Sequence, residues 1–208
     1  MKVKICGIRN LDAALAAERG GADFIGFIFY ARSRRWIHPE QAAQISQKIF
    51  HAKKVGVFVD EFAGEVNRIA RKVGLDYVQL HGHETAEYAA HIEIPVIKAW
   101  RYGDGFRAEA ANAFPSELVL VDSFVKGKAG GTGKTFSWED AAGELKKLRK
   151  SWLLAGGISF QNVKEAADLF QPYGVDVSGS LEVNGEKSVK KIQDFLTIVK
   201  RLNREGLR

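Results

Sequence analysis

The stretch VKICGI, Val3–Ile8, opens a pattern that runs through the whole chain. It is a short apolar run that ends in the only cysteine, Cys6, followed at once by Gly7. Because side chains alternate along a strand, Lys4 and Cys6 share one face. A thiol at the C-terminal end of a strand, beside a glycine at which the chain can turn, is well placed for chemistry. The alternative is that Cys6 is a small apolar packing group, as lone buried cysteines usually are.

Strand and helix patterns alternate from this first strand to the end of the chain. Apolar runs predict strands at residues 3–6, 24–29, 54–59, 77–80, 95–99, 118–121, 152–154 and 175–177. Amphipathic stretches predict helices at 11–19, 38–50, 61–73, 85–91, 106–113, 138–150, 159–170 and 188–202. Eight such units predict an α/β fold, a (β/α)8 TIM barrel in which residues 1–208 form a single domain. An open doubly wound sheet would normally carry a G-x-G-x-x-G turn after its first strand, and Gly7-Ile8-Arg9-Asn10 does not fit that turn.

The composition narrows the class of protein. Of the 208 residues, 46% are hydrophobic and 27% charged, which is typical of a soluble protein with one sizeable core. No apolar run approaches the roughly 18 residues of a membrane span, and no signal-peptide pattern precedes the first strand. A single cysteine cannot form an internal disulfide, so we expect a cytoplasmic location and no membrane partner.

The net charge of +6 permits either a nucleic-acid partner or a small anionic substrate. The basic residues are spread along the chain, and the cluster Lys146–Lys150 falls late in a predicted helix, where the helix dipole favours it. We therefore expect no nucleic-acid partner. The sequence leaves a monomer and a homodimer open.

Residues capable of chemistry follow the predicted strands, at the end where barrel enzymes place their sites. In chain order they are Cys6, Arg32–Arg35, Asp60, His81, Trp100-Arg101, Asp122, Gly156-Gly157 and Ser178-Gly179-Ser180. Glycines and small hydroxyls after the last two strands are typical of the barrel phosphate site, where backbone N–H groups face the anion. Gly130 and Gly131, in the loop after the sixth strand, can add further N–H groups. We therefore expect a small phosphorylated substrate, and we expect Asp60 to be a turn or cap residue.

The same motifs resemble a known family. The stretches are KICGI (4–8), GFIFYARSRRWI (26–37), VQLHG (78–82), GGTGKTFSW (130–138), LAGGI (154–158) and VDVSGSLE (175–182). In order and spacing they resemble the phosphoribosylanthranilate isomerases of tryptophan biosynthesis nearly end to end. One motif departs from the family, which commonly has Ser-Ser-Gly-Val-Glu where this chain has Ser178-Gly179-Ser180-Leu181-Glu182. Both versions offer small residues and free N–H groups.

The resemblance implies an Amadori rearrangement of N-(5-phosphoribosyl)anthranilate to 1-(2-carboxyphenylamino)-1-deoxyribulose 5-phosphate, with no cofactor or metal. It places the general base, which removes the C2 proton, on Cys6 and the general acid, which protonates the ring oxygen, on Asp122. The pKa of a free thiol is about 8.5 and that of a free carboxylic acid about 4. At neutral pH the thiol is therefore mostly protonated and the carboxylic acid mostly ionised, so both roles require a site that shifts these pKa values. The resemblance also places Arg35 at the anthranilate carboxylate, both of whose oxygens a guanidinium can bind. We expect His81 to line the pocket as a neutral, hydrogen-bonded side chain, and Arg32 and Arg34 to be solvated.

Two other functions compete with this reading. The first is a related sugar isomerase of histidine biosynthesis, or an enzyme that serves both pathways. Those barrels bind a phosphate at each end of a long substrate and use an aspartate where Cys6 stands. The loops after the third and fourth strands carry no second glycine-rich anion site, which disfavours them. A non-catalytic barrel that binds nucleic acid or a protein would explain the charge but not the residues at the strand ends.

Strand parity gives one further prediction. If Cys6 faces the active site, Lys4 points into the barrel one layer deeper, about 6–7 Å below it. Asp176 shares a face with Ser178, and closure makes the first and last strands neighbours. We therefore predict that Lys4 pairs with Asp176, because pairing relieves the penalty of burying each charge.

Overall fold

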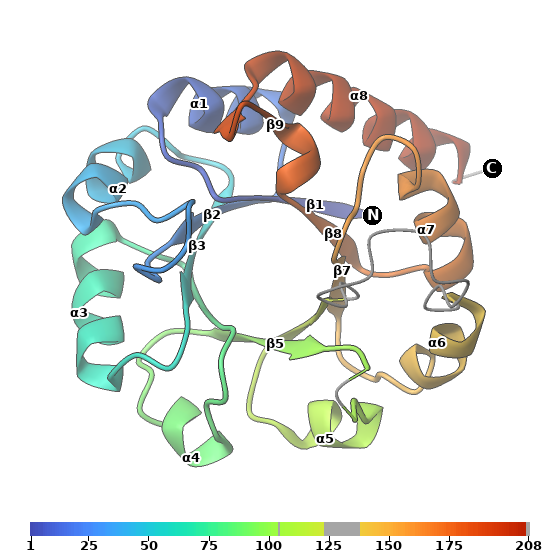
Figure 1. Ribbon diagram of the computed structural model, residues 1–208, viewed down its shortest axis with the longest axis horizontal. Coiled ribbons are helices and arrows are strands. Elements are labelled where there is room, and N and C mark those ends of the chain that lie inside the picture. Colours follow the sequence, from blue (N-terminus) through green and yellow to red (C-terminus); the bar gives the residue numbers. More distant parts are fainter. Residues whose placement is uncertain (104, 123–137, 207–208) are drawn as a thin grey trace.

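The computed structural model describes residues 1–103, 105–122 and 138–206, and it describes only the backbone of residues 138–140. Eight parallel strands close into a barrel in sequence order, and the helices form a ring around it (Figure 1). The strands are β1 (Lys2–Cys6), β2 (Phe24–Ile28), β3 (Lys53–Phe58), β4 (Tyr77–Leu80), β5 (Val96–Arg101), β6 (Leu118–Asp122), β7 (Trp152–Ala155) and β8 (Gly174–Val177). The helices are α1 (Leu11–Gly20), α2 (Pro39–Ser46), α3 (Ala63–Val73), α4 (Ala86–Ala89), α5 (Ala108–Ala113), α6 (Trp138–Leu145), α7 (Val163–Phe170) and α8 (Val189–Glu205). The predicted (β/α)8 barrel is confirmed.

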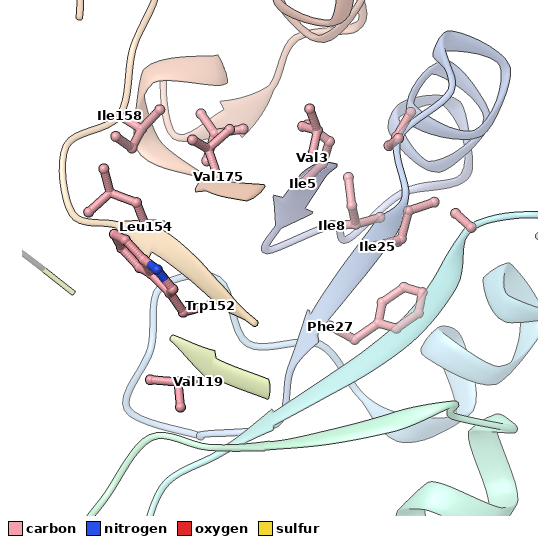
Figure 2. Packing of buried hydrophobic residues seen from close by; sticks show 14 of the residues in the cluster. Val3, Ile5, Ile8, Ile25, Phe27, Val119, Trp152, Leu154, Ile158 and Val175 are labelled. Atoms are coloured by element: carbon pink, nitrogen blue, oxygen red, sulfur yellow. The ribbon is translucent and has the colours of Figure 1, made fainter. Parts of the chain in front are cut away.

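Apolar side chains pack on both sides of the strands. The larger cluster lies between the strands and the helices, and Figure 2 shows Val3, Ile5 and Val175 among its members. A smaller cluster fills the barrel with side chains of the opposite parity, including Phe24, Val55 and Leu153. This two-sided burial explains why the strands read as nearly continuous apolar runs. None of the described helices is long and apolar enough to cross a membrane.

Several helices are shorter than predicted, and at three of them a side chain binds the backbone beside the helix end. The predicted helix 38–50 ends at Ser46, and the carboxylate of Glu18 accepts from the N–H groups of residues 50–52. The predicted helix 138–150 ends at Leu145, where Asn112 binds the carbonyl of residue 147 and the N–H of residue 149. The cluster Lys146–Lys150 therefore lies just past the C-terminus of α6, and its predicted place inside the helix was wrong. The predicted helix 159–170 starts at Val163, because Asn162 folds residues 157–159 into a turn.

The structure of the segment after β8 was not predicted. After β8 the chain forms a short 3-10 helix, η1 (Gly179–Leu181), and then a two-stranded antiparallel hairpin, β9 (Glu182–Val183) and β10 (Glu186–Lys187). Asn184 and Gly185 form the turn, with φ of 52° and 82°. An Asn-Gly pair is a strong hairpin signal, because both residues tolerate positive φ. The sequence VNGE carried that signal.

Candidate active site

Cys6 is the last residue of β1, and its buried thiol lies above a buried ion pair. Nζ of Lys4 donates to Oδ1 of Asp176 at 2.8 Å, and the Lys4 side chain is 0% exposed. In the strand register Lys4 lies opposite Asp176. The predicted pair between the first and last strands is confirmed.

Gly26, on the neighbouring strand β2, makes room for both reactive atoms. A Cβ at Gly26 would lie 3.0 Å from Sγ of Cys6 and 3.1 Å from Nζ of Lys4. Burial raises the pKa of the Cys6 thiol above its ordinary value, and the charge and hydrogen bond of Lys4 oppose that rise. Burial likewise opposes the charged form of Lys4, but Asp176 and Cys6 outweigh it and raise the Lys4 pKa. The ammonium thus stays charged beside the thiol.

Asp122 and His81 face one another across the barrel mouth. Asp122 is the last residue of β6, and His81 directly follows β4. Nε2 of His81 lies 3.6 Å from Oδ2 of Asp122, which is longer than a hydrogen bond. Nδ1 of His81 accepts from the side-chain amide of Gln79 at 2.9 Å. His81 is hydrogen-bonded, as predicted, and the bond fixes its ring beside Asp122.

Arg35 lies across the loops that follow β1 and β8. A Cβ at Gly7, where φ is 80°, would come within 2.6 Å of Cδ of Arg35. Gly7 therefore serves both the turn and the close approach of this side chain. The guanidinium binds Glu182 through Nε at 2.5 Å and Nη2 at 3.1 Å. Arg34, expected to be solvated, has a side chain 67% exposed but also donates to Glu182 at 3.0 Å.

The residues predicted to bind phosphate meet at the ends of β7 and β8. Gly156 and Gly157 both have positive φ, 88° and 76°. The hydroxyl of Ser178 donates to the carbonyl of Cys6 at 2.9 Å, and that of Ser180 to the carbonyl of Ile158 at 2.7 Å. These hydroxyls tie the loops together, so the backbone N–H groups are the better candidates for an anion. Gly130 and Gly131 lie outside the described residues.

Asp60, expected to be a turn or cap residue, is one. Its φ is 50°, and its carboxylate accepts from the backbone N–H of His83. That hydrogen bond outweighs partial burial and keeps the pKa of the Asp60 carboxyl below its ordinary value. Asp60 thus organises the loops after β3 and β4.

The arrangement is suited to acid–base chemistry on a small anion. A thiol and a carboxyl end strands β1 and β6 of one closed barrel, glycines follow β7 and β8, and an arginine lies against the loop after β8. A family model described as N-(5'phosphoribosyl)anthranilate (PRA) isomerase matches residues 3–198. The chain belongs to the PRA isomerase family.

Individual relatives agree with this assignment. An N-(5'-phosphoribosyl)anthranilate isomerase of Desulforamulus reducens is 43% identical over 98% of this chain and 97% of its own. The crystal structure of phosphoribosyl anthranilate isomerase from Thermus thermophilus has a TM-score of 0.84 and 35% identity, covering 97% of this chain and 100% of that one. Another solved PRA isomerase, 36% identical with a TM-score of 0.83, covers 97% of this chain and 99% of its own. That structure is a complex with reduced 1-(o-carboxyphenylamino)-1-deoxyribulose 5-phosphate.

Two charged residues beside Arg35 were not predicted from the sequence. Glu182 accepts hydrogen bonds from Arg35 and Lys187, and neither Glu182 nor Lys187 was expected to have a role. Both belong to the unpredicted hairpin β9–β10, where they are register partners. Recognition of the Asn-Gly turn would have placed them opposite each other.

Proposed function

We propose that this chain catalyses the Amadori rearrangement of N-(5-phosphoribosyl)anthranilate, with Cys6 as general base and Asp122 as general acid. The observation that carries the proposal is the match to the PRA isomerase family over residues 3–198, with these two side chains at strand ends of one barrel mouth. The product is 1-(2-carboxyphenylamino)-1-deoxyribulose 5-phosphate.

The base is the thiolate of Cys6. It takes the proton from C2 of the Schiff base that forms when the furanose ring opens, and the electron pair left behind gives the enolamine. Burial outweighs the ammonium of Lys4, so the pKa of the thiol stays above its ordinary value, but Lys4 limits that rise and so favours the thiolate. The Lys4–Asp176 pair supplies this charge without leaving a lone ammonium inside the barrel.

The acid is the carboxyl of Asp122, which gives its proton to the ring oxygen as the C1–O bond breaks. The Asp122 side chain is partly exposed, at 25%, so a substrate can reach it and cover it. Displacement of water from a carboxyl raises its pKa, which favours the protonated donor. His81, held by Gln79, lines the same part of the mouth.

The substrate carries two anionic groups, a carboxylate and a phosphate. Arg35 binds the anthranilate carboxylate, and the phosphate lies against backbone N–H groups of Gly156, Gly157, Ser178, Gly179 and Ser180, with Gly130 and Gly131 as further candidates. We further propose that residues 1–208 act as one cytoplasmic catalytic domain, as a monomer or a homodimer, on a small-molecule substrate and without nucleic acid.

A kinetic comparison tests the two roles. Cys6→Ser and Asp122→Asn should each lower kcat by about 100- to 10,000-fold while the product analogue still binds, since proton transfer is commonly worth that much. The loss of phosphoribosylanthranilate is followed by fluorescence. Asp168→Asn, which breaks an exposed ion pair with Lys164 on α7, is the control and should keep near-normal kcat. Near-normal kcat in either test variant would remove that residue from the mechanism, and turnover of only the histidine-pathway substrate would reject the assignment.

A further inference from the structure

A buried carboxylate in the loop after β8 is surrounded by three cations. Oε1 of Glu182 accepts from Nε of Arg35 at 2.5 Å and from Nζ of Lys187 at 2.7 Å. Oε2 accepts from Nη2 of Arg35 at 3.1 Å and from Nη2 of Arg34 at 3.0 Å. These four donors use the roughly four acceptor positions of a carboxylate. Glu182 is therefore held firmly in one orientation.

The hairpin β9–β10 is what brings Glu182 and Lys187 together. Its register pairs Lys187 with Glu182, and the Asn184-Gly185 turn fixes that register. The two side chains are 2% and 6% exposed, respectively, so both charges are removed from water. A buried ion pair contributes little to stability compared with apolar residues of the same volume. Stability alone therefore does not account for placing this pair beside the barrel mouth.

The contact with Glu182 fixes which edge of Arg35 is free. A guanidinium has a side edge, Nε and Nη2, and an end edge, Nη1 and Nη2. Glu182 occupies the side edge. Arg35 also packs over Gly7, and Nη2 would lie 3.2 Å from a Cβ at Gly179. Among the described residues, none accepts a hydrogen bond from Nη1 of Arg35.

We propose that Glu182 is a positioning residue, which fixes the guanidinium of Arg35 so that its end edge meets the substrate carboxylate, and that Lys187 holds Glu182 in place. This inference rests on the proposed function, in which Arg35 binds that carboxylate. Arginine side chains lose much rotamer freedom on binding, so an arginine held beforehand binds a carboxylate more tightly.

The charges around Glu182 agree with this role. One carboxylate among Arg34, Arg35 and Lys187 leaves the cluster with a net positive charge. Burial opposes ionisation of Glu182, but the hydrogen bonds from Arg35 and Lys187 outweigh it and keep the pKa of Glu182 below its ordinary value. The cluster can therefore hold Arg35 and still attract a second carboxylate.

Binding of two analogues separates a positioning role from a structural one. The first is reduced 1-(2-carboxyphenylamino)-1-deoxyribulose 5-phosphate, and the second is the same molecule without the carboxyl group. Glu182→Gln should weaken binding of the first analogue by about 10-fold or more, because a charged hydrogen bond to Arg35 is lost. The affinity for the second analogue should not change. In turnover, KM should rise more than kcat falls.

Glu186→Gln is the matched control, because Glu186 lies on the same hairpin and pairs with Arg9 with a side chain 60% exposed. It should leave both affinities unchanged. Glu182→Asp keeps the charge but has a shorter side chain, and it should show the same selective loss of affinity for the first analogue. This variant replaces Glu182→Gln in the test if Glu182→Gln does not fold.

Equal weakening of both analogues, or no weakening of either, would overturn the positioning role while leaving the proposed function intact. A wild-type protein that binds the second analogue as tightly as the first would overturn the role of Arg35 as well. A wild-type protein that neither turns over phosphoribosylanthranilate nor binds the first analogue would overturn both proposals.

Discussion

At the scale of single residues, the reactive thiol depends on what lies beneath it. Cys6 is buried, and burial by itself disfavours a thiolate. The charge of Lys4 offsets part of this penalty, and Gly26 leaves the space in which Sγ and Nζ approach one another. The absence of a side chain at Gly26 on β2 and the long side chain of Lys4 on β1 therefore both contribute to the environment of the thiol.

Replacing Lys4 tests this electrostatic link. Lys4→Met removes the ammonium and leaves Asp176 unpaired, and both changes should raise the pKa of Cys6. The midpoint of the plot of alkylation rate against pH should therefore move to higher pH. At a fixed neutral pH, alkylation of Cys6 should be slower than in the wild type. Lys2→Met is the control, since Lys2 is on the same strand and pairs with Asp23 at 2.8 Å in an exposed position. An unchanged alkylation profile in Lys4→Met would leave the Lys4–Asp176 pair with a purely structural role.

At the scale of elements, the sequence predicted what depends on local pattern. The eight strands were placed to within about two residues at each end, and Lys4 and Asp176 were paired correctly from parity alone. The helix ends at Ser46 and Leu145 were not predicted, because Glu18 and Asn112 bind those backbones from distant positions in the chain. Tertiary hydrogen bonds of that kind leave no local signal.

The candidate site could likewise be predicted from the sequence only in part. Strand order places Cys6, His81 and Asp122 at one end of the barrel, so sequence reasoning can bring them together. The contact of Arg35 with Glu182 joins loops 147 residues apart, and nothing in either loop announces it. The hairpin that carries Glu182 was in principle readable from Asn184 and Gly185.

A third buried ion pair ties β5 to the loops that follow β3 and β4. Nζ of Lys98 donates to Glu84 at 2.7 Å and to the carbonyl of Gly82 at 2.8 Å. Glu84 in turn accepts from the N–H groups of Asp60 and Gly82. This clamp holds the loop that begins with His81.

Breaking this clamp should be costly. Glu84→Gln leaves the buried Lys98 ammonium without its counter-charge, so we expect a loss of about 3–5 kcal/mol in the free energy of unfolding. Lys98→Met should restore part of that loss in the double variant, because no buried charge then remains unpaired. Urea unfolding of the four proteins measures the cycle, and Asp168→Asn, which breaks an exposed pair with Lys164, should change little. Strictly additive losses would show that the two residues act independently.

At the scale of the whole molecule, several carboxylates act as anchors between distant segments. Glu18, on α1, accepts hydrogen bonds from three successive backbone N–H groups, those of residues 50–52, before β3. Glu182 connects the β2 and β8 loops, with the side chains of Arg35 and Lys187 as its donors. Each carboxylate must be ionised to accept these bonds fully, which links the fold to pH.

The direction of that link follows from Glu18. Burial alone would raise the pKa of Glu18, but the three N–H donors outweigh it and hold the pKa below the ordinary value. Its contribution to stability is therefore fully present above the unfolded-state pKa, about 4.3, and is lost as the pH falls through the folded-state pKa. We expect the free energy of unfolding to fall as the solution is acidified below about pH 5, because the unfolded chain binds more protons there.

Glu18→Gln should therefore cost about 1 kcal/mol at pH 7, where wild-type Glu18 is ionised, and much less at pH 3. An amide cannot titrate, so the acid limb of the stability curve should also become shallower in the variant. Urea unfolding at a series of pH values measures both effects, with Glu109→Gln on the exposed first turn of α5 as the control. A variant whose stability curve ran parallel to that of the wild type down to pH 3 would show that Glu18 does not couple the segment before β3 to the rest of the fold through its charge.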